Sequence, residues 1–124
     1  EVLDSGQIHN QAAFRLAQSA CFDVLAPGVT SEDLMRTIAE VYEEEGVLDL
    51  WGRNVGHGLG LTIHEPPRIA AGQNTVFEAG MIVAIEPVLG GVEGIGTYGQ
   101  CDCCVINEHG CEVFTPHEKG LYVI

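Results

Sequence analysis

The sequence predicts an α+β fold in which two helices pack on a mostly antiparallel sheet. Up to Gly46, apolar side chains recur at the spacing of amphipathic helices. After Trp51 the pattern changes to the alternation and short apolar runs of strands, interrupted by glycine and proline. The 124 residues contain no internal repeat and no linker composition, so we expect residues 1–124 to form a single unit.

Two helices are expected in the first part of the chain. The first covers about residues 5–25, where one apolar stripe recurs every four residues and a second lies beside it: Ile8, Ala12, Leu16 and Ala20, then Ala13, Ala17 and Cys21. The run Ala26-Pro27-Gly28 ends this helix. Thr30 and Asp33 have the spacing of a capping box, which predicts a second helix that ends near Gly46.

The rest of the chain predicts strands and loops. Leu59, Leu61 and Ile63 alternate and indicate a strand that runs to His64, and the double proline that follows favours an extended edge segment. Residues 81–87 are the clearest buried strand, and Pro87 ends it. The remaining assignments are a loop at 70–80, a long glycine-rich loop at 90–99, and a hairpin of 103–106 and 111–115 around a four-residue connection, 107–110.

The composition excludes several classes of partner. There are 18 Asp and Glu against five Lys and Arg, a net charge of −13, so we expect no nucleic acid and no anionic membrane as partner. No apolar run approaches the roughly 20 residues of a membrane span. Five cysteines, three of them in Cys101-Asp102-Cys103-Cys104, match neither a disulfide framework nor the paired spacing of a structural zinc site. We therefore expect a cytoplasmic protein with free thiols.

Glu86 is the first candidate for chemistry. In an extended strand its side chain follows Ile82 and Ala84 on one face, so a carboxylate ends an apolar row. It either faces water or is paired, because a buried unpaired carboxylate is costly. Since the chain has few cationic side chains, a histidine or a metal ion is the expected partner.

His57 and His64 are the second candidate. Their spacing of seven fits neither the helical pair of a metal site nor two positions on the same face of a strand. They converge only if Gly56, Gly58 and Gly60 bend the backbone between them. The alternative is two unrelated structural imidazoles. Of the other histidines, His9 and His109 are expected at the surface, and His117 either at the edge of the site or outside it.

Taken together, four segments in this order and spacing resemble the pita-bread superfamily of methionine aminopeptidases, Xaa-Pro dipeptidases (prolidases) and creatinases. They are Gly56-His57-Gly58-Leu59-Gly60, His64-Glu65-Pro66-Pro67, Gly80-Met81 and Ile85-Glu86-Pro87. Residues 25–46 resemble the helix–Pro-Gly–helix passage that precedes the first of these motifs in the family. The resemblance implies a pita-bread half-fold, the C-terminal portion of a catalytic domain, completed by an N-terminal half or by a second copy in a homodimer.

The resemblance also implies a metal-dependent hydrolase of peptide or small amide substrates, most like an Xaa-Pro dipeptidase. Family members usually hold two divalent ions (Mn, Co, Zn or Fe) that activate a water. His57 and Glu86 match metal ligands, and His64 matches the histidine that stabilises the tetrahedral intermediate. Arg68, just after the double proline, is a candidate for binding a substrate carboxylate.

One position departs from the family. The last metal-binding glutamate falls at Gln100 or Cys101 depending on the register, and neither is a carboxylate. Asp102 is adjacent, but a slip of one residue turns a side chain to the opposite face of a strand. The two family aspartates would precede this segment. Two alternatives therefore remain open: a catalytically inactive pita-bread binding module, and a metal-independent, creatinase-like hydrolase.

Overall fold

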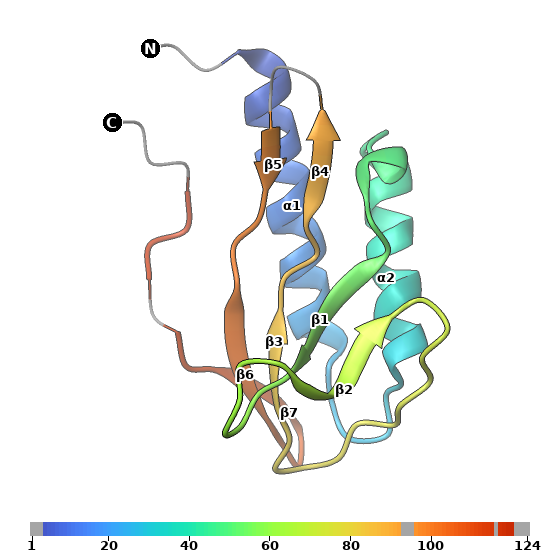
Figure 1. Cartoon of the computed structure of the whole chain (residues 1–124), viewed down its shortest axis with the longest axis vertical. Helices are drawn as coiled ribbons and strands as arrows, with labels where there is room; N and C mark the ends of the chain where they lie inside the picture. The colour runs from blue at the N-terminus through green and yellow to red at the C-terminus, as the bar shows by residue number, and fades with distance from the viewer. Residues whose placement is uncertain (1–3, 93–95, 116, 121–124) are drawn as a thin grey trace.

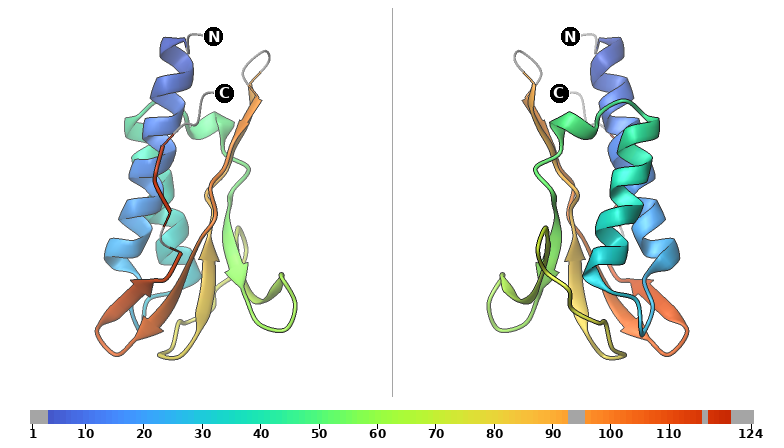
Figure 2. Two further views of the ribbon diagram at one scale, coloured as in Figure 1. Left: turned by 90° about the vertical axis from the view of Figure 1, so that its left-hand side faces the viewer. Right: turned by 90° about the vertical axis from the view of Figure 1, so that its right-hand side faces the viewer.

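A computed structural model describes residues 4–92, 96–115 and 117–120 (Figure 1). Two helices, α1 (Ser5–Val24) and α2 (Ser31–Glu44), lie side by side along one face of a twisted sheet (Figure 2). This five-stranded antiparallel sheet has the order β2-β1-β3-β6-β7, and a separate pair, β4 and β5, extends beyond it. The expected α+β arrangement is confirmed. The strands are β1 (Asn54–Gly58), β2 (Glu65–Ala70), β3 (Ile82–Ile85), β4 (Leu89–Val92), β5 (Gly96–Tyr98), β6 (Asp102–Asn107) and β7 (Gly110–Val113), and a short 3₁₀ helix, η1 (Leu48–Leu50), precedes β1.

Both helices begin at capping boxes. Asp4 accepts a hydrogen bond from the backbone N–H of Gln7, whose side chain accepts from the N–H of Asp4. Thr30 and Asp33 form the predicted box at the start of α2. Only one of the two stripes predicted on α1 is buried, because the helix presents Ala13, Ala17 and Cys21 to the core. Ile8 and Leu16, from the other predicted stripe, are exposed.

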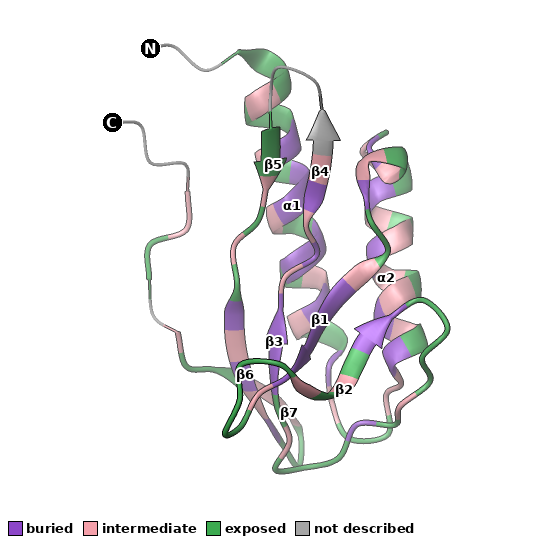
Figure 3. Ribbon diagram, in the orientation of Figure 1, coloured by how far each residue is buried: buried purple, intermediate pink, exposed green. Residues whose placement is uncertain are grey.

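The core lies between the helices and the sheet (Figure 3). The inward side chains of the three central strands meet those of the helices there: Val55, Val83, Ile85, Cys104 and Ile106 against Phe14, Leu34, Ile38 and Tyr42. The Tyr42 hydroxyl donates to the carbonyl oxygen of Pro87, which ties α2 to the chain just beyond β3. The helices thus cover one face of the sheet, and the site described below lies on the other.

Residues 59–64 are not the strand that their alternation predicted. They form a loop from β1 to β2, in which the side chains of Leu61 and Ile63 are 104% and 71% exposed. The strand lies earlier, at β1, which pairs with β2 on one side and β3 on the other. Sequence alternation gave the wrong segment because β1 is rich in glycine rather than in branched apolar residues. Pro66 and Pro67 do lie in an edge strand, as predicted.

Two other predictions need correction. The expected glycine-rich loop at 90–99 contains the paired strands β4 and β5, with residues 93–95 outside the described part of the chain. The hairpin of β6 and β7 is tighter than predicted, because Asn107 pairs with Gly110 and only Glu108 and His109 form the turn. All five cysteines are free thiols. No helix in the described residues is long and apolar enough to cross a membrane.

Candidate metal centre

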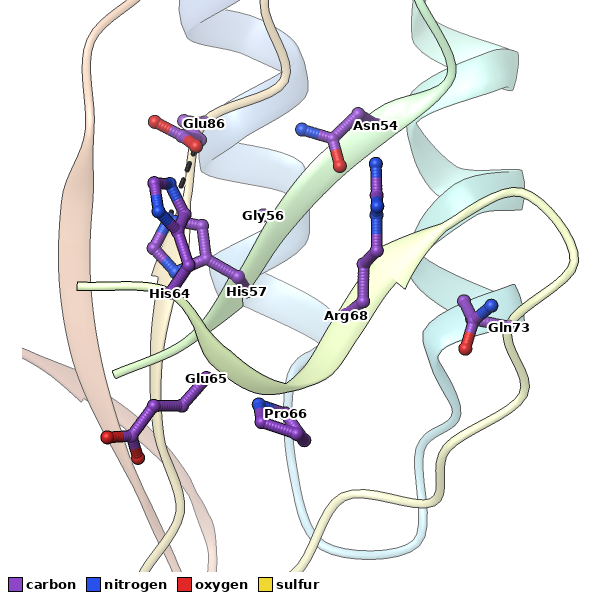
Figure 4. Close-up of a pocket in the computed structure, with 9 residues that line it drawn as sticks. All are labelled: Asn54, Gly56, His57, His64, Glu65, Pro66, Arg68, Gln73 and Glu86. Carbon is purple, nitrogen blue, oxygen red and sulfur yellow. Dashed lines mark ion pairs between the residues drawn. The ribbon is translucent and has the colours of Figure 1, made fainter. Parts of the chain in front are cut away.

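A cleft of about 490 Å³ opens on the face of the sheet that the helices leave uncovered. Strands β1 and β2 and the residue after β3 form its walls, and α1 and α2 lie behind the sheet (Figure 4). His57, His64 and Glu86 gather at one end of this cleft, and Arg68 and Asn54 lie toward the other (Figure 4). The sequence-predicted residues of the candidate site therefore share one cavity, with the exception of Gln100 and Cys101.

His57 is held in the middle of the sheet. It pairs with Arg68 of β2 and Ala84 of β3, and its side chain is buried. Its Nδ1 lies 2.9 Å from the carbonyl oxygen of Gly58, and its Nε2 lies 3.4 Å from Oε1 of Glu86. A ring nitrogen bonded to a carbonyl oxygen must carry the proton, so the neutral imidazole presents the Nε2 lone pair toward Glu86.

Glu86 is positioned by the end of β3. Its backbone N–H donates to the carbonyl oxygen of Val55 at 2.6 Å, and Pro87 follows directly. The preceding side chain, Ile85, points into the core, so the Glu86 side chain emerges on the cleft side. Of the two alternatives for this residue, the structure shows the carboxylate facing His57 rather than water, and the two acceptor atoms that meet there need a proton or a cation between them.

His64 reaches the same end of the cleft from the loop after β1. The rings of His57 and His64 have centroids 4.4 Å apart, with planes inclined at 59°. The loop turns back through hydrogen bonds from the N–H of Thr62 to the Glu65 carboxylate (2.8 Å) and from the N–H of Gly60 to the carbonyl of Thr62 (3.3 Å). Two histidines seven residues apart thus converge, as the glycine-rich path between them suggested.

The three side chains offer a metal-binding donor set. One atom of each, from His57, His64 and Glu86, lies within 4.8 Å of the others, and no other such group of three occurs among the described residues. Two imidazole nitrogens and one carboxylate oxygen suit borderline divalent ions such as Zn²⁺, Co²⁺, Mn²⁺ and Fe²⁺. The residues present therefore fit a divalent cation.

The structure separates Gln100 from Cys101. Gln100 lines a second cavity, about 320 Å³, beside Gln11 of α1 and Tyr98 of β5. Cys101 is exposed, and partial burial of its sulfur, followed by Cys103 and Glu86, raises the pKa of its thiol to about 12. Asp102 is completely buried on the helix side of the sheet, as the one-residue slip predicted.

The remaining histidines lie outside the cleft. His9 and His109 are exposed, as expected. His9 lies beside the Glu45 carboxylate, and His117 lies 3.5 Å from Asp102. Neither histidine lines the cleft that holds His57, His64 and Glu86.

The sequence did not single out two polar residues of the site region. Asn54 lines the cleft beside Arg68 (Figure 4). Gln18 is a buried residue of α1 whose amide donates to the carbonyl oxygens of Ile85 and Gln100, both at 2.9 Å. A signal for Gln18 was present, because it lies four residues from Phe14 and three from Cys21, on the buried stripe of α1. A polar residue within an apolar stripe needs a hydrogen-bond partner.

The fold defines the class of the protein. The chain superposes on the Xaa-Pro dipeptidase of Bacillus anthracis with a TM-score of 0.91 and 28% identity, over 99% of this chain and 34% of that one. The X-Pro aminopeptidase of Thermotoga maritima gives the same TM-score of 0.91 at 24% identity, over 99% and 35% of the two chains, and shows the fold alone. The architecture is therefore that of the pita-bread proteins.

Sequence comparison narrows the class to a family. Metallopeptidase family M24 matches residues 3–110, and the chain belongs to this family. It is 33% identical over 110 residues to the Xaa-Pro dipeptidase of Lactobacillus helveticus, covering 89% of this chain and 30% of that protein. The chain thus spans less than a third of the length of this curated relative, a fraction that fits the C-terminal half expected from the sequence.

Proposed function

We propose that this chain is the C-terminal portion of the catalytic domain of a metal-dependent peptidase of the Xaa-Pro dipeptidase type. The observation that carries the proposal is the cluster of His57, His64 and Glu86, whose donor atoms lie within 4.8 Å of one another in an open cleft. Membership of family M24 and similarity to an Xaa-Pro dipeptidase support a peptide or small amide substrate.

His57 and Glu86 are the proposed metal ligands. The hydrogen bond from Nδ1 of His57 to the Gly58 carbonyl keeps Nε2 free to bind, and Glu86 offers its carboxylate to the same space. Two divalent ions (Mn, Co, Zn or Fe) are expected from the family, with further ligands from outside residues 1–124. Such an ion lowers the pKa of a bound water and polarises a substrate carbonyl.

His64 and Arg68 are the proposed substrate-facing residues. His64 is exposed at the mouth of the cleft, and its imidazole N–H would donate to the oxyanion that develops as the scissile carbonyl becomes tetrahedral. Arg68 lines the cleft away from the histidines, where its guanidinium can form a bidentate pair with a substrate carboxylate. The chain as a whole carries a net charge of −13, so Arg68 gives the cleft a local positive charge that favours binding of an anionic substrate group.

The test compares two histidine substitutions in the full-length protein, assayed with an Xaa-Pro dipeptide after addition of Mn²⁺ or Co²⁺. We expect His57→Ala to lose bound metal and activity together. We expect His64→Ala to keep its metal and to lower kcat by about 100- to 1,000-fold, the usual cost of one oxyanion donor. Loss of metal in His64→Ala would mean that the two roles are exchanged, and a wild-type protein without metal or cleavage would overturn the proposal.

A catalytically inactive binding module is the second candidate, because the position expected for the last family glutamate falls at Gln100 or Cys101, and neither is a carboxylate. It predicts that a peptide binds in calorimetry without being cleaved. The third, a metal-independent creatinase-like hydrolase, predicts turnover that survives a strong chelator. Inactivation by the chelator and recovery with added metal would exclude both alternatives.

We also propose a cytoplasmic location and a completing partner. Five free thiols suit a reducing compartment. The partner is an N-terminal half of the same protein or a second copy in a homodimer. Ile8 and Leu16, which α1 exposes, are apolar side chains that such a partner would cover.

A further inference from the structure

We infer that Cys101 supplies a thiolate ligand to the cation held by His57 and Glu86, and that the site therefore selects a thiophilic ion such as Zn²⁺ over Mn²⁺. This inference rests on the proposed function, because it takes the cluster to be a metal centre. It adds a ligand and a metal preference that the histidine and glutamate residues alone do not define.

The strand register brings Cys101 next to Glu86. Strands β3 and β6 are antiparallel, and their last pair is Ile85 with Asp102. The next positions outward, Glu86 and Cys101, are therefore neighbours across the two strands. Ile85 and Asp102 are fully buried on the helix side, so alternation turns the side chains of Glu86 and Cys101 to the opposite, cleft-bearing face.

Gln18 holds the two chain segments together just beyond the last backbone pair of β3 and β6. Its side-chain amide donates to the carbonyl oxygens of Ile85 and Gln100, at 2.9 Å each, one on either chain segment. Gln18 is only 4% exposed, so both bonds form away from water, where they are costly to break. The backbones that carry Glu86 and Cys101 are thus held side by side by one buried amide.

The two candidate positions face different ways. Gln100 lines the cavity next to α1, on the far side from His57. Cys101 is exposed and lies one position beyond Asp102, at the end of the ladder where Glu86 follows Ile85. Its sulfur is not among the donor atoms within 4.8 Å of one another, so ligation requires a change of its χ1 rotamer. An exposed side chain makes such a change readily.

The donor chemistry sets the metal preference. Imidazole and carboxylate alone accept many divalent ions, whereas a thiolate favours Zn²⁺ and Co²⁺ over the oxygen-seeking Mn²⁺. A site of one histidine, one glutamate and one cysteine (His57, Glu86 and Cys101) contains only donors that Zn²⁺ uses in proteins.

The test is a titration of the metal-free full-length protein with Co²⁺, followed by absorption spectroscopy. We expect visible ligand-field bands together with an intense near-ultraviolet thiolate-to-cobalt band. Cys101→Ser should lose the near-ultraviolet band and keep the visible ones. Competition should show Zn²⁺ affinity lower by about 100-fold while Mn²⁺ affinity changes little, since even an outer partner of a metal ligand is worth about 10- to 100-fold.

Cys103→Ser is the matched control, because Cys103 lies on β6 only two residues after Cys101, on the cleft-bearing face, opposite Ala84. It should keep both absorption bands, and circular dichroism should show that both variants are folded. Visible bands without a thiolate band in the wild-type protein would overturn the role of Cys101 and leave the proposed metal centre standing. A thiolate band that Cys103→Ser abolishes would also overturn it. Absence of all cobalt bands would overturn both this inference and the proposed function.

Discussion

Gly56 shows how closely the backbones of the central strands approach one another. It lies in β1 between Ile69 of β2 and Ile85 of β3. A Cβ atom placed on Gly56 would overlap the carbonyl oxygen of Ala84, which belongs to the backbone of β3 and cannot move aside alone. The glycine next to His57 is thus required by the sheet itself.

We predict that Gly56→Ala lowers the free energy of unfolding by about 2 kcal/mol or more, because overpacking inside a sheet forces a backbone shift. Urea denaturation measures this change. Gly52→Ala is the control, since a Cβ at Gly52 meets no atom within 4 Å. Equal stability of the two variants would show that β1 and β3 separate easily at this point.

At the level of single residues, the sequence predicted the candidate metal-binding side chains more readily than the buried residue that holds the strands around them. Motif order and spacing led to His57, His64 and Glu86, and the structure brings them together. Gln18 was not anticipated, because its two partners are backbone carbonyls 67 and 82 residues away in the chain. Such a contact leaves no local pattern beyond a polar residue in an apolar stripe.

At the level of an element, the capping box of α2 was predicted correctly from the sequence. Thr30 and Asp33 were paired from sequence, and the structure contains both reciprocal hydrogen bonds. The backbone N–H of Thr30, then its hydroxyl and then Arg36, lower the pKa of the Asp33 carboxyl. The cap is therefore stronger when Asp33 is ionised.

The lowered pKa of Asp33 makes the stability of the protein fall as the pH is lowered. A carboxyl whose pKa is lowered on folding stabilises the protein above its unfolded pKa, and the contribution is lost as the pH falls through the folded pKa. We predict that wild type melts at a higher temperature than Asp33→Asn at pH 6, and that the difference shrinks below about pH 4, the ordinary range of an aspartate. Thermal melting across this range measures it.

Thr30→Ala provides the control for the capping interaction. Once the threonine hydroxyl is removed, adding Asp33→Asn should change the melting temperature less than it does in wild type, because the two side chains act as one box. A melting difference that stayed constant with pH would contradict the assigned cause.

The elements that the sequence missed depend on tertiary pairing. Leu61 and Ile63 alternate like strand residues, yet the loop from β1 to β2 leaves them exposed. In β4, Leu89 forms a bridge with the distant Trp51 and pairs with Tyr98 of β5. Glycine-rich segments have weak intrinsic strand preference, so only such distant partners define them as strands.

At the scale of the whole molecule, Asp102 joins three parts of the fold. Its carboxylate, fully buried at the start of β6, accepts hydrogen bonds from the Lys119 ammonium and from the Thr115 hydroxyl at 2.7 Å. The carbonyl oxygen of Lys119 in turn accepts from the Arg15 guanidinium of α1 at 2.5 Å. The segment after β7 is thereby fastened to both the sheet and the first helix.

The second oxygen of Asp102 has no hydrogen-bond partner among the described residues. The carboxylate therefore depends strongly on Lys119, which is its closest cation. A buried charge that loses its cationic partner is destabilised by its own desolvation, whereas a neutral group of similar shape is not.

We predict that Lys119→Met lowers the free energy of unfolding by about 3 kcal/mol, the usual effect of removing one partner of a buried ion pair. The double variant Asp102→Asn with Lys119→Met should recover most of that loss, because no charge is then left buried. Arg36→Met is the comparison, since Arg36 pairs with Asp33 at the exposed surface, where solvent screens the interaction and ion pairs contribute little. Urea denaturation of the four proteins separates the effects. If Lys119→Met costs no more than Arg36→Met, then Thr115 and His117 hold the Asp102 charge without the lysine, and the segment after β7 is anchored by other contacts.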